Sequence, residues 1–205
     1  MYQVKFVNRG PCLAWSRLCQ RVLTDDYRKV FLMTGVVLLD GNPRAGSRTA
    51  GIARQVAAAV ASRLDLPVGA EVSLSGLLPA LASTAEAATA EVDAALDLVT
   101  TAEVLVVATP LYKATYTGLL KLFVDRFPRD ALAGTVAIPL VTAGFAGQLL
   151  AAEVHLRPLL VEVGAAVPTR AFVLTEAEFS EVDGAVSRWL TAAEPMLRRA
   201  LPQRV

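Results

Sequence analysis

The chain has 205 residues, of which 54% are hydrophobic, and its 20 Lys and Arg against 19 Asp and Glu leave a formal net charge of +1 at pH 7. This length and composition indicate a folded α/β domain with a substantial core, and they argue against a chain that depends on disulfides or a metal for folding. The near-zero charge, with no basic stripe carrying interleaved aromatics, argues against nucleic acid, so we expect small-molecule partners.

The first 32 residues differ from the rest in charge and in cysteine content. They hold six Lys and Arg against two Asp, whereas residues 33–205 hold fourteen against seventeen, and they contain both cysteines, Cys12 and Cys19. We interpret residues 1–32 as an N-terminal extension and residues 33–205 as the functional domain; a targeting peptide or an arm that packs on another subunit are the alternatives. Because no long apolar signal core is present, the expected location is the cytoplasm.

From residue 33 onward, apolar runs alternate with helical periodicities, which is typical of a parallel sheet with helices on both faces. Residues 36–39 are the first predicted strand, and residues 71–74 are a weak second strand. Residues 75–88, which contain Pro, Ser and Ala, predict a loop. Between the two strands, four-residue spacing predicts the buried stripe of a helix formed by Ile52, Val56, Val60 and Leu64.

The alternation continues to the end of the chain. Three further strands are predicted at residues 104–108, 135–141 and 169–174. One helix is predicted before these strands, around Val92, Leu96 and Val99. A second has a broad apolar face formed by Leu119, Leu120, Phe123, Val124 and Phe127. Two more are predicted over residues 148–163 and 176–199. Five strands with right-handed crossovers predict a flavodoxin-like three-layer sandwich, with a five-stranded parallel sheet in the order 2-1-3-4-5 and helices on both faces.

Two features of residues 131–152 need an explanation within this fold. The stretch carries no charge, but its glycines and Pro139 divide it into a strand, a turn and a helix start, so we predict no membrane span. Pro139 itself lies inside a predicted strand, where a proline removes a ladder donor and is normally confined to edges or bulges.

The junction of the first strand and helix, residues 41–49, indicates a phosphate site. Backbone N–H groups at a helix N-terminus favour an anion, and Arg44, Ser47, Arg48 and Thr49 add positive charge and hydroxyl donors. A P-loop is excluded because its lysine is replaced by Ser47, and the three closely spaced glycines of a dinucleotide loop are missing. A tight turn with Ser47 or Thr49 capping the helix is the structural alternative.

Three loops are expected to meet beyond the carboxyl ends of the strands, where the strand order reverses. They are residues 41–49, 109–113 and 142–144. A mononucleotide with its phosphate in the first loop would lay its ring against the other two, and FMN fits that arrangement. Tyr112 and Tyr116 are interpreted either as ligand contacts or as amphipathic packing at a helix start.

His155 is the only histidine of the chain. A metal site or a Ser-His-Asp mechanism would need it, but it lies in a helical stretch where a solvated face is the expected position. Cys12 and Cys19 are too few and too widely spaced for a zinc site. We therefore predict neither metal nor nucleophilic chemistry.

Three segments carry a resemblance to a known family. They are Gly-Asn-Pro-Arg at 41–44 with Ser-Arg-Thr at 47–49, the whole of residues 108–121, and Ile-Pro-Leu-Val-Thr-Ala-Gly at 138–144. Over roughly residues 34–200 the chain resembles the NAD(P)H-dependent FMN reductases of the flavodoxin-like fold, especially those that serve two-component alkanesulfonate monooxygenases. Asn42 stands where that family usually has serine, Ala143 and Gly144 replace a Gly-Gly pair, and the subgroup's proline matches Pro139.

The resemblance implies a function and a set of cofactor-binding residues. Hydride would pass from the nicotinamide of NADPH or NADH to the flavin, with no catalytic acid or base and no metal, because the cofactor supplies the chemistry. Phosphate contacts are expected in the first loop, and ribityl and isoalloxazine contacts in the other two. The implied FMN-binding residues are Asn42, Arg44, Ser47, Arg48, Thr49, Pro110, Leu111, Tyr112, Lys113, Thr142, Ala143 and Gly144.

The resemblance also implies partners: a homodimer or homotetramer, and a flavin-dependent monooxygenase that receives reduced FMN. One alternative is an FMN-containing quinone or azo reductase. Another is a non-enzymatic flavodoxin-like carrier or regulator that holds FMN tightly. Nothing outside the flavin loops resembles a 2′-phosphate site, so the choice between NADH and NADPH stays open.

Overall fold

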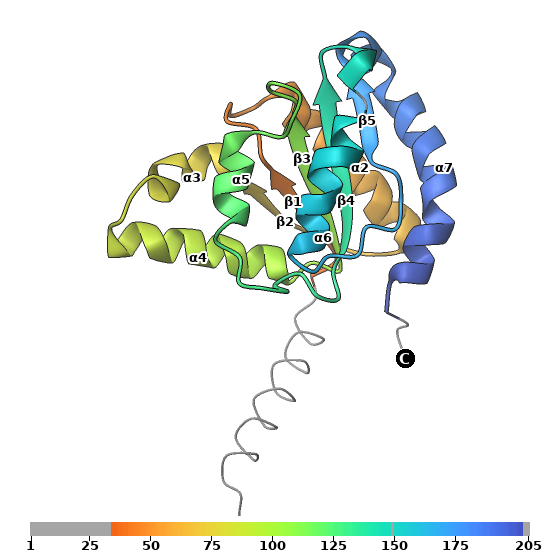
Figure 1. Cartoon of the computed structure of the whole chain (residues 1–205). Helices are drawn as coiled ribbons and strands as arrows, with labels where there is room; N and C mark the ends of the chain where they lie inside the picture. The colour runs from red at the N-terminus through yellow and green to blue at the C-terminus, as the bar shows by residue number, and fades with distance from the viewer. Residues whose placement is uncertain (1–33, 149, 203–205) are drawn as a thin grey trace, which may run out of the picture. The chain divides into compact units, whose positions relative to one another are not determined.

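The computed structural model describes residues 34–148 and 150–202, so the predicted extension with Cys12 and Cys19 lies outside the described residues. Five parallel strands of the described part form a sheet in the order β2-β1-β3-β4-β5, which confirms the predicted order (Figure 1). The strands are β1 (Val36–Asp40), β2 (Val68–Ser73), β3 (Val104–Pro110), β4 (Val136–Ala143) and β5 (Phe172–Thr175).

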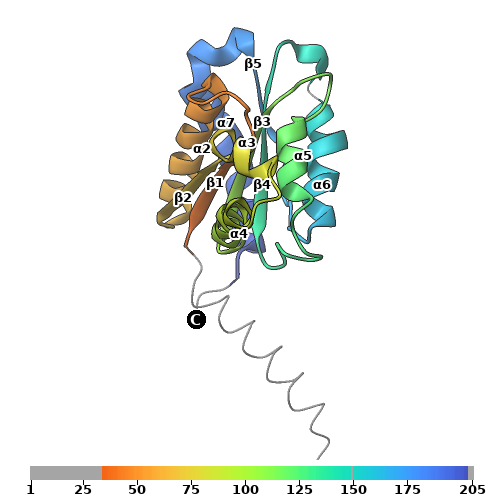
Figure 2. The same ribbon diagram turned by 90° about the vertical axis from the view of Figure 1, so that its left-hand side faces the viewer.

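Helices cover both faces of this sheet, as Figure 2 shows with the sheet between them. One face packs against α2 (Arg48–Leu64) and α7 (Val182–Ala200). The opposite face packs against α3 (Leu74–Leu81), α4 (Glu86–Thr100), α5 (Gly118–Val124) and α6 (Arg157–Glu162). Short irregular turns complete the described part: η1 (Ala146–Gln148), the π-helix η2 (Ala152–Leu156) and η3 (Glu176–Glu181).

The core explains why these segments adopt these conformations. β1, β3 and β4 are buried along their whole length, as expected for strands of a parallel sheet that is covered on both faces. The predicted apolar stripe of α2 is confirmed, since all four residues are buried against the sheet. None of the helices in the described part is long and apolar enough to span a membrane.

The predicted loop over residues 75–88 is wrong, because α3 occupies Leu74–Leu81 and α4 begins at Glu86. Leu74, Ala80 and Leu81 are buried in the core, so tertiary packing holds a helix that contains Pro79 and would be unstable alone. The second strand also begins earlier than predicted, at Val68, because most of this edge strand is only partly buried and lacks an apolar pattern.

Pro139 occupies a place in β4 where no ladder donor is needed. The N–H of Ala137, two residues earlier, donates to the carbonyl oxygen of Ala166 at 2.8 Å on the β5 side. Alternate residues of a strand face the same neighbour, so the nitrogen of Pro139 also faces that side. β4 pairs with β5 only from Leu140 onward, which leaves Pro139 opposite the gap before β5 begins.

β5 begins at Phe172 rather than at the predicted Thr169 because a side chain uses the preceding carbonyl groups. The Arg157 guanidinium donates to the carbonyl oxygens of Val167 at 2.6 Å and Thr169 at 2.5 Å. The other predicted helices exist, with different ends. Residues 148–163 contain the π-helix η2 before α6, residues 176–199 begin as the 3-10 helix η3, and α5 ends before Phe127.

Candidate functional site

The loop after β1 is shaped by two side chains that bond to nearby backbone. Asp40 is buried, and its Oδ1 accepts the N–H of Asn42 at 3.1 Å, while Asn42 Oδ1 accepts the N–H of Arg44 at 2.9 Å. Burial raises the pKa of Asp40 above its ordinary 3.8, although the bond from Asn42 opposes the shift. These successive bonds set the path of the loop toward α2.

Gly41 lets this loop pass closely over the neighbouring strand. Its N–H donates to the carbonyl oxygen of Ala108 at 2.8 Å, and its own carbonyl oxygen accepts the hydroxyl of Thr117 at 2.6 Å. A Cβ at this position would lie 3.0 Å from Cβ of Leu120 and 3.1 Å from the oxygen of Ala108. A side chain at this position would therefore be tightly packed against both neighbours.

A buried chain of hydrogen bonds joins the first loop to the third. Asn42 Nδ2 donates to Thr49 Oγ1 at 3.2 Å, and Thr49 Oγ1 lies 2.7 Å from Thr142 Oγ1 at the end of β4. All three residues are buried. These bonds fix the distance between the loop after β1 and the end of β4, and so set the width of the space between them beyond the sheet edge.

The start of α2 carries the features of an anion site. Ser47 is the N-cap, and its Oγ accepts the N–H of Ala50 at 3.1 Å, so the predicted capping of the helix by Ser47 is confirmed. A serine hydroxyl that accepts one bond still has a donor to offer a ligand. The first turn of α2 contains no acidic residue, which leaves the positive end of the helix dipole without a carboxylate partner from that turn.

The second loop follows β3 and makes a tight two-residue turn. Leu111 donates its N–H to the carbonyl oxygen of Thr142 at 2.9 Å, which attaches this loop to β4. Tyr112 and Thr115 then exchange backbone bonds around Lys113 and Ala114, whose φ angles are 54° and 65°. This turn, with two positive φ values outside glycine, places Lys113 at its tip, where the residue is exposed.

These loops enclose a cavity of about 260 Å³ at the carboxyl edge of the sheet, where the loops after β1, β3, β4 and β5 gather at the upper end of Figure 1. This volume is close to the lower limit of small-molecule pockets, about 300 Å³. Eleven of the twelve predicted site residues line the cavity, and Lys113 is the exception. The lining residues are Asn42, Arg44, Ser47, Arg48, Thr49, Pro110, Leu111, Tyr112, Thr142, Ala143, Gly144, Glu176 and Phe179.

Two of these lining residues, Glu176 and Phe179, were not predicted. Glu176 Oε1 lies 2.6 Å from Nη2 of Arg48, and the Arg48 guanidinium carbon lies 4.8 Å from the centre of the Phe179 ring. Both residues follow β5, whose carboxyl end lies at the same sheet edge as those of β1, β3 and β4. The expectation that loops meet beyond the carboxyl ends of the strands, applied to the fifth strand as well, would have found them.

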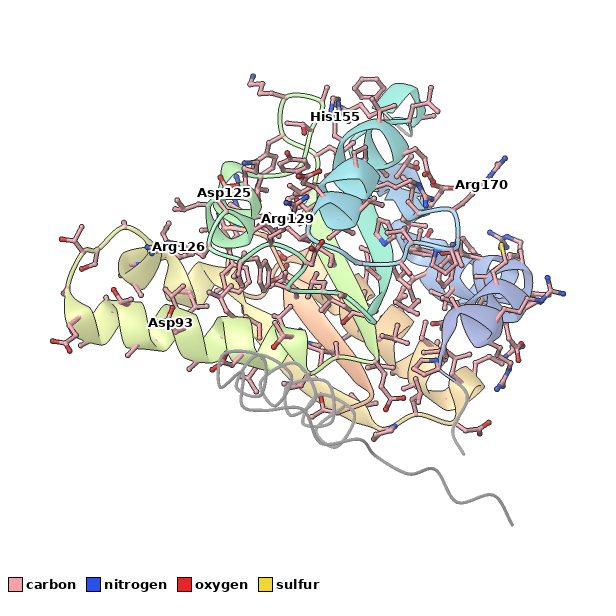
Figure 3. All side chains as sticks on the ribbon, turned by 60° about the horizontal axis from the view of Figure 1, so that its bottom comes forward. Asp93, Asp125, Arg126, Arg129, His155 and Arg170 are labelled. Atoms are coloured by element: carbon pink, nitrogen blue, oxygen red, sulfur yellow. The ribbon has the colours of Figure 1, made fainter. Side chains whose placement is uncertain are left out.

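Tyr112 and Tyr116 have different positions. Tyr112 is 41% exposed and lines the cavity, whereas Tyr116 is partly buried against the core and does not line it. His155 is exposed on η2, in agreement with its predicted solvated position (Figure 3). Within the described residues, no cluster of three or more His, Cys, Asp or Glu could hold a metal ion.

Residues 34–179 match the family model of the NADPH-dependent FMN reductases. The chain belongs to this family. The predicted family is therefore confirmed, and the three segments that carried the resemblance supply eleven of the residues that line the cavity.

Other members of the FMN reductase family, and one solved structure, are similar to this chain. The FMN reductase (NADPH) of Escherichia coli K12 is 49% identical over 59 residues, which are 29% of this chain and about a third (31%) of that protein. The NADH-dependent FMN reductase SfnF of Pseudomonas putida is 33% identical over 126 residues, 60% of this chain and 68% of that protein. The apo structure of the NADH:FMN oxidoreductase EMOB superposes with a TM-score of 0.70 at 33% identity, covering 83% of this chain and 91% of that one.

The cavity of this FMN reductase family member has a donor set that suits a flavin mononucleotide. Arg44, which makes no ion pair with a described residue, and Ser47, the N-cap of α2, both line the cavity, and a guanidinium and a hydroxyl are donors of the kind that a phosphate accepts. The wall formed by Pro110, Leu111 and Ala143 is apolar, as a flat ring requires.

Proposed function

We propose that this protein is an NAD(P)H-dependent FMN reductase that holds the FMN phosphate at the start of α2. The observation that carries the proposal is the cavity in which eleven predicted residues from three separate loops meet, in a chain of this family. Arg44, Arg48, Ser47 and the first amides of α2 would bind the phosphate through charge and hydrogen bonds.

The other two loops would position the ring. Leu111 is held by its bond to Thr142, and Gly144 donates its N–H to Gln148 Oε1 at 3.3 Å, so both walls are anchored by bonds to other residues. When bound, FMN supplies the hydride-accepting centre of the reaction. The chain then has to orient the flavin and leave one ring face open to the nicotinamide, and no side chain is required as acid or base.

We also propose that reduced FMN leaves the site for a flavin-dependent monooxygenase and that the chain acts as a homodimer or homotetramer. Exposed apolar side chains lie near the cavity on the segment after β4, with Phe145 62%, Leu150 74% and Val154 60% exposed, and they support a subunit contact there. Sedimentation analysis of the full chain tests the assembly.

The first experiment is oxidation of NADPH and of NADH by flavin-stripped protein, with and without added FMN. Oxidation that saturates with FMN supports the proposal, and the ratio of the two rates gives the nicotinamide preference. Turnover with a quinone or azo dye but not with free FMN favours the quinone or azo reductase instead. Tight FMN binding without nicotinamide oxidation favours the carrier or regulator.

A binding experiment tests the phosphate site separately. Arg44→Gln should weaken FMN binding about tenfold or more, because a charged hydrogen bond is worth about 1.5–3 kcal/mol, and should leave riboflavin binding unchanged. Arg54→Gln is the matched control, since Arg54 lies on α2, which follows the loop of Arg44, but it pairs with Glu71 of β2 at 2.7 Å and does not line the cavity. Equal losses for FMN and riboflavin in Arg44→Gln would refute the phosphate assignment.

A further inference from the structure

Arg48 differs from Arg44 because its guanidinium already has partners at the cavity. Glu176, the first residue of η3, accepts its hydrogen bond at 2.6 Å, and Phe179 presents its ring 4.8 Å from the guanidinium carbon. Arg48, Glu176 and Phe179 all line the cavity. A carboxylate therefore stands beside the cation that the proposed function assigns to a phosphate.

A phosphate and the Glu176 carboxylate would require the same guanidinium. The two side chains of the ion pair are 67% and 54% exposed, and an exposed pair of this kind contributes little to stability, so a doubly charged anion can displace it. If Arg48 stayed on Glu176, the carboxylate would instead repel the phosphate. Phe179 can keep the guanidinium at the cavity while it changes partner, through its contact with the ring face.

We propose that Glu176 weakens FMN binding and speeds FMN release by competing with the flavin phosphate for Arg48. This inference rests on the proposed function, and it gives Glu176 a role toward phosphorylated flavins alone. A reductase that releases its flavin gains from such a competitor, because Glu176 can pair with Arg48 as the phosphate leaves.

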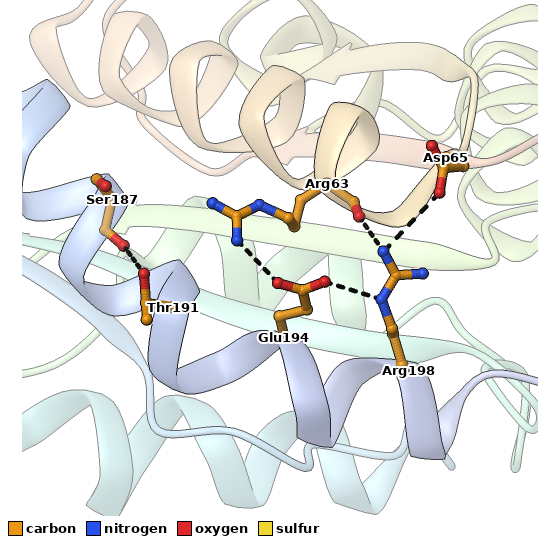
Figure 4. A network of polar contacts seen from close by, with 6 residues as sticks. All are labelled: Arg63, Asp65, Ser187, Thr191, Glu194 and Arg198. Carbon is orange, nitrogen blue, oxygen red and sulfur yellow. Dashed lines mark hydrogen bonds and ion pairs between the residues drawn. The ribbon is translucent and has the colours of Figure 1, made fainter.

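The test measures dissociation constants of FMN and riboflavin by flavin fluorescence, and the rate constant of FMN dissociation by stopped flow. Glu176→Gln should lower the Kd for FMN about twofold to fivefold, the factor that corresponds to an exposed ion pair, and slow FMN dissociation. Riboflavin binding should not change. Glu194→Gln is the control. Glu194 pairs with Arg63 of α2 at 2.8 Å (Figure 4), and neither residue lines the cavity.

The same change in an Arg48→Gln background separates competition from simple repulsion. Competition predicts that Glu176→Gln then has no effect on FMN binding, whereas an undiminished effect would overturn the inference. An unchanged or weaker affinity of the single Glu176→Gln variant would also overturn it. If the unaltered chain binds no FMN, the proposed function itself is wrong; if it binds FMN and only the Glu176 effect is missing, the inference alone fails.

Discussion

Replacing Thr49 with valine should destabilise the protein by interrupting the buried hydrogen-bond chain between the first and third loops. Thr49 is 4% exposed, and its hydroxyl is within hydrogen-bond distance of Asn42 Nδ2 and Thr142 Oγ1. Valine keeps the shape of the side chain but removes the hydroxyl, which leaves two buried polar groups without this partner.

The magnitude follows from those two groups. An unsatisfied buried group costs about 1–3 kcal/mol, so the lower value for each gives a loss of about 2 kcal/mol in the free energy of unfolding. For a domain of this size, that loss corresponds to a Tm lower by about 4–8 °C. Thr49→Ser keeps the hydroxyl and should therefore keep most of the free energy of unfolding that Thr49→Val loses.

Urea unfolding followed by circular dichroism measures the effect, and Thr191→Val is the matched control. Thr191 is exposed on α7, and its hydroxyl donates to the carbonyl oxygen of Ser187 at 2.8 Å (Figure 4). This surface change should alter the free energy of unfolding by less than about 0.5 kcal/mol. Equal effects for the Thr49 and Thr191 variants would show that the buried chain does not stabilise the loops.

Two further predictions concern the same loop. Asp40→Asn should raise the free energy of unfolding at pH 7, because burial raises the pKa of Asp40 and its ionised form therefore costs the folded state stability above that pKa. The gain should shrink as the pH falls toward 3.8, and a pH-independent difference in urea unfolding would contradict this origin. Gly41→Ala should lower the free energy of unfolding by about 1–3 kcal/mol through overpacking, whereas Gly51→Ala, in open space on α2, should raise it by about 0.5–1 kcal/mol. Thermal melts that lower both Tm values equally would refute the steric argument at Gly41.

The local patterns of the sequence were sufficient for most of the fold. Buried strands and the four-residue stripe of α2 are repeated signals within short segments, and the observed strand order is the flavodoxin-like one that five strands with right-handed crossovers fit. The 74–81 segment escaped prediction because its helix depends on packing against the core and contains Pro79. The late start of β5 was not predicted for a similar reason, since Arg157 of α6 donates hydrogen bonds to the carbonyl oxygens of the residues before it.

The sequence by itself predicted three of the loops that line the cavity, because a parallel sheet brings the carboxyl ends of its strands to one edge; the segment after β5 was missed. Only the tertiary structure decided how those loops are joined. The Thr49–Thr142 bond links residues 93 positions apart, and the Arg48–Glu176 pair links residues 128 apart. Neither follows from local spacing, because each depends on where β4 and β5 end relative to α2. A hydrogen bond forms only over a few tenths of an ångström, and that precision is set by the packing of the whole sheet against its helices.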